Sequence, residues 1–70
     1  MNDLEVRIGK RLQQTRRARG VSLAALAAAV GISELHLAAI EQGTRRLQPG
    51  DLISACSFLD ATIEEFMHDI

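Results

Sequence analysis

Residues 22–43 decide the fold, and they read SLAALAAAVGISELHLAAIEQG. Ser22 is a typical helix N-cap residue, because its hydroxyl can accept a hydrogen bond from a free backbone N–H of the first turn. The stretch 23–30 that follows is rich in alanine, the strongest helix former. Gly31 then favours the end of a helix. The first half of this segment therefore predicts a helix of eight residues.

A second helix is predicted over 34–42, after a turn of three residues. Ser33 is its N-cap residue and Gly43 its C-terminal stop. Apolar side chains that would close the joint between the two helices are Leu26, Ala27, Val30, Ile32, Leu37 and Ile40. So short a turn holds the helices at a steep angle, which is the helix-turn-helix pattern and lets the second helix project into a DNA major groove.

The flanking sequence also indicates helices. Gly20 would end an amphipathic first helix, Pro49 suits the first turn of another, and Thr62 with Glu65 has the spacing of a capping box. We expect these three helices over roughly 4–19, 49–59 and 63–68. No stretch alternates with period two, so no strand is predicted. The expected fold is a compact, all-α domain of five helices that spans residues 1–70.

Length and composition exclude several classes of protein. The 70 residues are 47% hydrophobic and 24% charged, the balance of a globular domain. The longest apolar run, 23–30, is too short to span a membrane, and the first 20 residues have no secretory signal pattern. We expect a cytoplasmic protein. We also expect a homodimer, because so short a chain is marginally stable alone.

The net charge is −1, but the charged residues are distributed unevenly along the chain. Residues 1–33 carry six Lys or Arg against two acidic residues, which gives +4, whereas residues 47–70 carry five acidic residues and no base, which gives −5. The basic half could bind phosphate groups, and it could equally be an ordinary solvated helix face.

Over about residues 8–67 the chain resembles helix-turn-helix regulators of the phage lambda repressor and Cro (XRE) type, which include small controller proteins and antitoxins. The motifs that carry this resemblance are IGKRL at 8–12, Arg16, GVS at 20–22, LA at 26–27, GIS at 31–33, IEQG at 40–43 and GTRR at 43–46, followed by Leu52, Leu59, Ile63 and Phe66. The resemblance implies a bacterial or phage-type transcriptional regulator that binds operator DNA as a homodimer. It also implies a structural ion pair between Arg16 and Glu41.

Specific contact roles follow from the same resemblance. The residues that would face base edges are Glu34, Leu35, Ala38 and Ala39. The positions that would face phosphates are Arg11, Arg16, Arg17, Leu23, Thr44, Arg45 and Arg46. Candidate dimer contacts are Ile53, Phe58, Phe66, Met67 and Ile70, of which the last three could instead belong to the core.

Departures from the family pattern favour a second hypothesis. Leu23 stands where the family often has a phosphate-binding Gln, and residues 34–39 contain no Arg, Lys, Asn or Gln, the side chains that most often read guanine and adenine. If Leu23 and Leu35 are exposed, they could form an apolar face for a protein partner, such as a transcription factor or a toxin. The molecule would then act as an antiactivator, antirepressor or antitoxin.

Catalysis is not expected. The chain has no paired His–carboxylate motif and no Gly-rich phosphate loop. His68 has no partners at metal-ligand spacing, and the lone Cys56 occupies a position where the family has a small core residue. We therefore expect no enzyme activity, no metal and no cofactor.

Overall fold

The computed structural model describes residues 3–70 of the protein. Its helices are α1 (Asp3–Ala18), α2 (Leu23–Val30), α3 (Glu34–Glu41), α4 (Pro49–Phe58) and α5 (Ile63–Met67). These described residues contain no strand, so the predicted all-α class is confirmed. Each predicted helix is present, and its ends lie within one residue of the expected ones.

Side-chain caps define where three of the helices begin. The Ser22 hydroxyl accepts a hydrogen bond from Ala25 N, and the Ser33 hydroxyl accepts one from His36 N. Thr62 Oγ1 accepts from Glu65 N, which is the hydroxyl half of the predicted capping box. Each cap satisfies a backbone donor that the helix itself leaves unpaired.

The end of α2 depends on a backbone conformation that favours glycine. Gly31 has φ +88°, and its N–H donates to the carbonyl of Ala27. A side chain on an L-residue would crowd the backbone in this left-handed region. Gly31 therefore turns the chain sharply toward α3, as the sequence pattern predicts.

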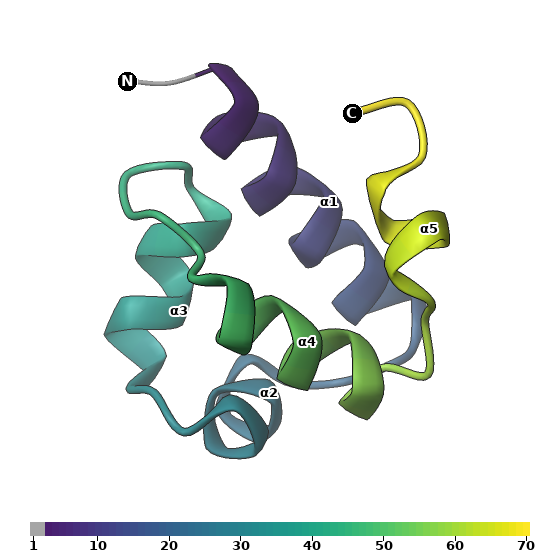
Figure 1. Cartoon of the computed structure of the whole chain (residues 1–70). Coiled ribbons are helices and arrows are strands. Elements are labelled where there is room, and N and C mark those ends of the chain that lie inside the picture. Colours follow the sequence, from purple (N-terminus) through teal and green to yellow (C-terminus); the bar gives the residue numbers. More distant parts are fainter. Residues whose placement is uncertain (1–2) are drawn as a thin grey trace.

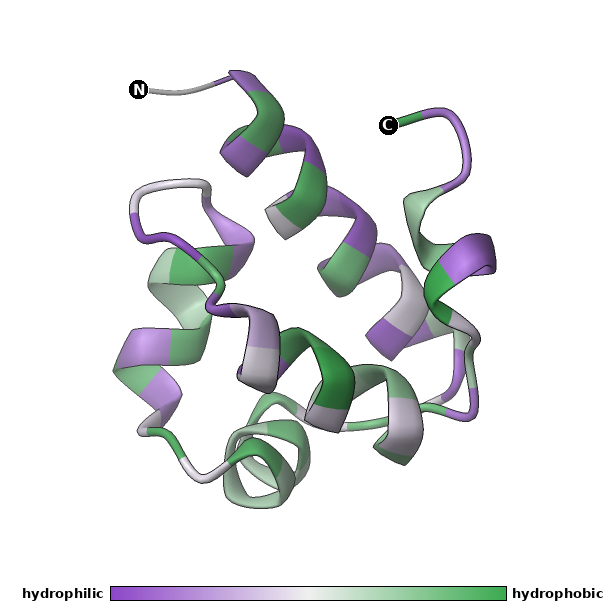
Figure 2. Cartoon of the chain, viewed as in Figure 1, coloured by the Kyte–Doolittle hydropathy of each residue, from purple (hydrophilic) through white to green (hydrophobic). Residues whose placement is uncertain are grey.

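Figure 1 shows α1 running between α3 on one side and α5 on the other, while α4 packs against α2. The core between them contains Leu12, Leu26, Ala27, Leu37, Ile40, Ala55, Cys56, Leu59 and Phe66, all at most 3% exposed. Hydrophobic residues dominate α2, whereas α1 alternates between hydrophilic and hydrophobic segments (Figure 2). All five helices contribute to one core or lie against it, so none is an appendage.

α1 and α3 approach each other closely at Gly9 of α1. A Cβ atom added to Gly9 would lie only 2.0 Å from the carbonyl oxygen of Ile40 in α3. Only a residue without a side chain permits this contact. Gly9 thereby allows α3 to lie directly on α1.

Two residues with predicted surface roles belong to the core region instead. Phe66 was a candidate dimer contact, yet it is 2% exposed and packs within the core. Leu23 was placed facing phosphate, but it is half-buried and packs against the same core. Of the two places that the sequence left open for Phe66, the structure therefore shows the core. The contact of Leu23 with phosphate stays a prediction, although part of its side chain is taken up by packing. Burial of such large apolar side chains stabilises a small domain.

Arginines of α1 and of the turn that follows it hold the C-terminal part of the chain by its backbone. Arg11 Nη1 donates to Phe66 O at 2.8 Å, and Arg19 Nε donates to Leu59 O at 2.8 Å. Arg7 Nη2 donates to the carbonyl oxygen of Asp69. Charged side chains thus satisfy carbonyls at the C-terminal ends of α4 and α5, where no intrahelical donor remains.

Within residues 3–70 no single helix is long and apolar enough to cross a membrane. Taken as a pair, α2 and α3 pass that test by length and composition alone, with a bend of 105° between them.

Candidate nucleic-acid interface

The candidate interface is built on the angle between α2 and α3. Their axes are bent by 105°, inside the range of about 90–120° that is typical of helix-turn-helix motifs. α3 buries Leu37, Ile40 and Glu41 on its inner side. Its outer side is consequently turned to solvent, where a ligand can reach it.

The predicted base-facing residues occupy that outer side. Glu34 is exposed, and Leu35 is 85% exposed, the most exposed large hydrophobic side chain in the described residues. Ala38 and Ala39 follow one turn later and are half-buried. The structure thus brings these four residues together on one helix, and their contact with base edges stays a prediction.

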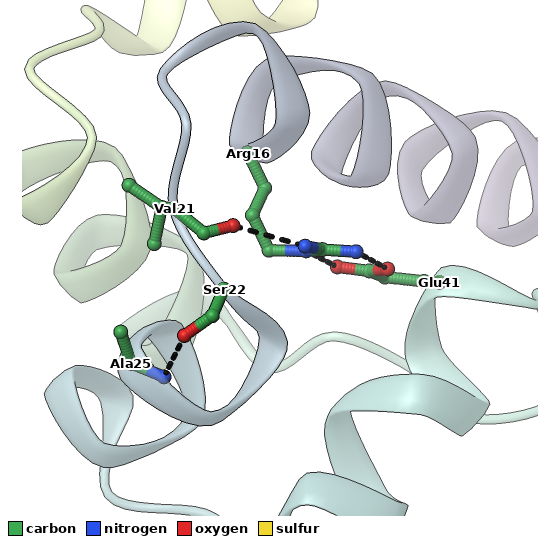
Figure 3. A network of polar contacts seen from close by, with 5 residues as sticks. All are labelled: Arg16, Val21, Ser22, Ala25 and Glu41. Atoms are coloured by element: carbon green, nitrogen blue, oxygen red, sulfur yellow. Dashed lines mark hydrogen bonds and ion pairs between the residues drawn. The ribbon is translucent and has the colours of Figure 1, made fainter.

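Beneath this surface lies the Arg16–Glu41 ion pair, which links α1 to the end of α3 (Figure 3). Arg16 Nε donates to Glu41 Oε2 at 2.7 Å, and Arg16 Nη2 donates to Oε1 at 3.0 Å. The remaining terminal nitrogen, Nη1, donates to Val21 O at 3.0 Å. The hydrogen bonds to Glu41 raise the pKa of Arg16 above its ordinary value, against the opposing effect of burial.

This geometry removes Arg16 from the predicted phosphate contacts. Arg16 is only 8% exposed, and each of its three guanidinium nitrogens already has a protein acceptor. Arg16 instead holds α3 in a defined position against α1. The structure therefore contains the predicted ion pair and contradicts the predicted phosphate contact.

Two further residues with predicted phosphate contacts have protein partners. Arg11 is held at the end of α5, where its Nη1 donates to Phe66 O. The Thr44 hydroxyl donates to Ala39 O at 3.0 Å, so its one proton satisfies a carbonyl at the end of α3. Phosphate oxygens accept hydrogen bonds, and the Thr44 hydroxyl has no proton left to donate to them. Arg11 keeps the donors of Nε and Nη2, so its phosphate contact stays a prediction.

Three of the residues with predicted phosphate contacts have no competing protein partner among residues 3–70. Arg17, Arg45 and Arg46 are exposed, and their side chains have no polar partner in the part of the chain that the structure describes. Arg45 and Arg46 lie in the loop directly after α3. Arg46 also lines a hollow of about 280 Å³ with Leu4, Glu5, Ile8 and Leu47, beside the first turns of α1.

Sequence reasoning missed one polar side chain at this surface. Gln42, the C-cap residue of α3, is exposed. It stands three and four positions after Ala39 and Ala38, the spacing of neighbours on a helix surface. Glutamine is a common reader of adenine. Counting one turn beyond residue 39 would have found it.

The comparison with known families decides the class of protein. The helix-turn-helix domain family matches residues 7–68 of the chain. The chain belongs to this family. The predicted resemblance to helix-turn-helix regulators is thereby confirmed, and the residues that build the interface all lie within the matched range.

Solved structures of regulators share this helix-turn-helix fold. The clp gene regulator ClgR from Corynebacterium glutamicum has a TM-score of 0.92 and 28% identity, covering 96% of this chain and 71% of that one. The restriction-modification controller protein C.AhdI from Aeromonas hydrophila has a TM-score of 0.86 and 26% identity, covering 94% of this chain and 100% of that one. No curated protein matches the sequence significantly.

The controller protein C.Esp1396I shares the fold alone. Its TM-score is 0.87, but its identity is 18%, over 97% of this chain and 90% of that one. Together with ClgR and C.AhdI, it shows that the arrangement of five helices is preserved although most side chains differ. The shared fold therefore does not determine which ligand is recognised, and the chain's own surface residues do.

Three further large apolar side chains are exposed on α4 and at the start of α5. Ile53 is 62% exposed and Phe58 is 49% exposed, as the dimer prediction requires, and Ile63 adds a third apolar side chain at 42%. Met67 and Ile70 are half-buried. Met67 packs on the core, and Ile70 lines a hollow of about 170 Å³ with Arg7, Lys10, Arg11 and Gln14.

The described residues contain no cluster of metal ligands and no exposed thiol. Across residues 3–70, no three His, Cys, Asp or Glu side chains approach one another as a metal site would need. The Cys56 thiol is 3% exposed, and burial raises its pKa. Buried and protonated, Cys56 serves packing.

Proposed function

We propose that this chain is a transcriptional regulator that binds duplex DNA sequence-specifically as a homodimer, with α3 in the major groove. The observation that carries this proposal is the outer side of α3. This side faces away from the core, and α3 lies at 105° to α2. The loop after α3 carries two arginines whose side chains have no partner in residues 3–70. A major groove about 12 Å wide admits one α-helix.

Phosphate contacts would come from the loop after α3. The Arg45 and Arg46 side chains are exposed and unpaired among the described residues, so binding DNA would break no protein contact of theirs. Arg17 could add a third charge from α1. Each phosphate that a cation neutralises releases counterions, and this makes the affinity depend on salt.

Dimerisation would use the exposed apolar side chains of α4. Ile53 and Phe58 are too exposed to contribute much to the core, and burial against a second copy would remove them from water. A two-fold dimer would place two copies of α3 about 34 Å apart, in successive major grooves. Such a regulator would act in the cytoplasm, where a bacterium keeps its DNA.

A protein partner is the second candidate function. Leu35, at 85% exposure, favours it, because an exposed leucine at the centre of a recognition surface costs free energy in water. Leu23 no longer supports it, since that side chain packs on the core. The unpaired arginines after α3 favour DNA over this alternative.

Binding to random duplex DNA tests the proposal. We expect micromolar binding at about 50 mM salt that weakens steeply by about 200 mM. Replacing both Arg45 and Arg46 by alanine should lower the slope of log affinity against log salt by about 2, because each lost phosphate contact removes about 0.9. The control is Lys10→Ala, which removes a charge beside Ile70, away from the loop, and should leave the slope unchanged.

Absence of duplex binding by the folded protein at about 50 mM salt would overturn the proposal. The face around Leu35 would then be assigned to a protein partner. Equal slopes for the double variant and the wild type would overturn the role of the loop, and they would require another set of cations.

A further inference from the structure

A carboxylate and apolar groups form most of the outer side of α3 near its N-terminal end. The side chains exposed or half-buried in that part of the helix are those of Glu34, Leu35, His36, Ala38 and Ala39. An ionised glutamate only accepts hydrogen bonds, and leucine and alanine have no polar side-chain group, so the half-buried His36 is the one side chain of this set that can donate. The exposed Gln42 can donate, but it lies at the far end of the helix, whereas base edges are contacted by the N-terminal residues of a recognition helix.

Such a surface can recognise only some base edges. Guanine presents two acceptors in the major groove, N7 and O6, which would repel the carboxylate of Glu34. Cytosine presents the N4 amino group, which donates to a carboxylate. Thymine presents a C5 methyl group, which suits contact with alanine or leucine. The carboxylate and the apolar side chains of this surface therefore match pyrimidines.

The order of residues places an acceptor and apolar groups side by side. Glu34 and Ala38 are four positions apart on α3, so they are neighbours on one face, with Cβ atoms about 5–6 Å apart. Leu35 stands next to Glu34 and projects into solvent. A cytosine that carries a C5 methyl group also presents a donor and a methyl group side by side on its major-groove edge.

We propose that α3 reads pyrimidines through their C5 methyl groups and one cytosine amino group, so that C5 methylation of the cytosine facing Glu34 strengthens binding. This inference rests on the proposed DNA binding and specifies which base features that same surface recognises. Leu35 and Ala38 contact the methyl groups, and Glu34 accepts from N4.

The experiment uses a duplex selected by the full chain from a random pool. Each thymine of the selected half-site is replaced by uracil, which removes only the C5 methyl group, and each cytosine by 5-methylcytosine. Fluorescence anisotropy at one salt concentration gives the Kd. We expect uracil at a contacted position to weaken binding about fourfold, and 5-methylcytosine opposite Glu34 to strengthen it about fourfold, the effect of burying one methyl group.

Two variants assign the effects to side chains. Leu35→Ala should abolish the loss of affinity that uracil causes at the thymine contacted by Leu35. The variant should fold normally because Leu35 is 85% exposed. Glu34→Gln should shift the preferred base from cytosine toward adenine, which pairs with a glutamine amide. The matched control is Glu64→Gln, an exposed glutamate in the first turn of α5, which should change neither effect.

The outcomes separate this inference from the proposed function. Salt-dependent duplex binding with a Kd that uracil and 5-methylcytosine leave unchanged would overturn methyl recognition and leave DNA binding intact. A selected half-site that requires guanine opposite Glu34 would do the same. Absence of binding to every duplex at low salt would overturn both proposals together.

Discussion

Arg16 and Glu41 form a two-pronged ion pair between α1 and the last residue of α3, with Nε–Oε2 and Nη2–Oε1 distances of 2.7 and 3.0 Å. Glu41 is 7% exposed and Arg16 is 8% exposed, so the pair lies inside the protein. The ion pair fixes the position of α3 relative to α1, and therefore how far the outer side of α3 projects into solvent.

Loss of one partner should destabilise the protein more than loss of both. Glu41→Ala leaves the Arg16 guanidinium buried without its counter-charge, and we expect a loss of about 3–5 kcal/mol in the free energy of unfolding. The double variant Arg16→Met with Glu41→Leu should recover most of that loss. Urea unfolding monitored by circular dichroism measures both, and equal stability of the wild type and Glu41→Ala would contradict this account.

Gly9→Ala should push α1 and α3 apart. The added Cβ would lie 2.0 Å from Ile40 O, a backbone atom that cannot rotate away. We expect a loss of at least about 1–3 kcal/mol. Gly50→Ala is the matched control, because its Cβ would meet no atom within 4 Å, and it should be neutral or stabilise the protein by up to about 1 kcal/mol. Similar melting temperatures for the two variants would be inconsistent with this packing.

Arg11→Ala should loosen α5. The side chain donates to Phe66 O at 2.8 Å, and its loss leaves a part-buried carbonyl unpaired at the end of that helix. We expect a cost of about 1 kcal/mol and faster hydrogen exchange in residues 63–67. Lys10→Ala, an exposed neighbour with no polar partner among residues 3–70, should leave exchange unchanged. Equal exchange in both variants would show that Arg11 does not hold α5.

Cys56 should make the protein less stable in alkali. Burial raises the pKa of its thiol above the ordinary value, so the folded state favours the protonated form. This contribution is fully present below the unfolded pKa of about 8.5 and is lost as pH rises through the higher folded value. The chain contains no tyrosine, which leaves few other groups that titrate there.

Thiol chemistry and a variant check that prediction. Labelling of native Cys56 at pH 8 should be slow and should accelerate on unfolding. Cys56→Ala should flatten the decline in stability above about pH 8.5. Rapid labelling of the folded protein would contradict the burial of this side chain.

Ile53→Glu should prevent dimerisation. It places a charge in the proposed apolar contact of α4, where burial without a partner is costly. Light scattering should then report the mass of a single chain where the wild type gives twice that mass. Leu35→Glu introduces the same charge on α3 and should leave the mass unchanged. Identical masses for Ile53→Glu and the wild type would move the dimer contact away from α4.

Local features of this protein could be predicted from its sequence. Ser22, Ser33 and Thr62 cap helices because each hydroxyl meets a backbone N–H only three residues away. Gly31 ends α2 because a left-handed backbone favours glycine there. The Arg16–Glu41 pair was implied by family resemblance, since nothing local connects residues 25 positions apart. Helix order, the turn and the all-α class follow from these short-range interactions.

Only the tertiary structure decided which charged and apolar side chains remain at the surface. Arg11 was predicted to face phosphate, yet it binds a carbonyl of the C-terminal third, as Arg19 does. Every residue carries the same backbone carbonyl, so no pattern in the sequence indicates which one an arginine will meet. Phe66 likewise has the same hydrophobicity in a core as in an interface, and only its neighbours in space place it 2% exposed in the core.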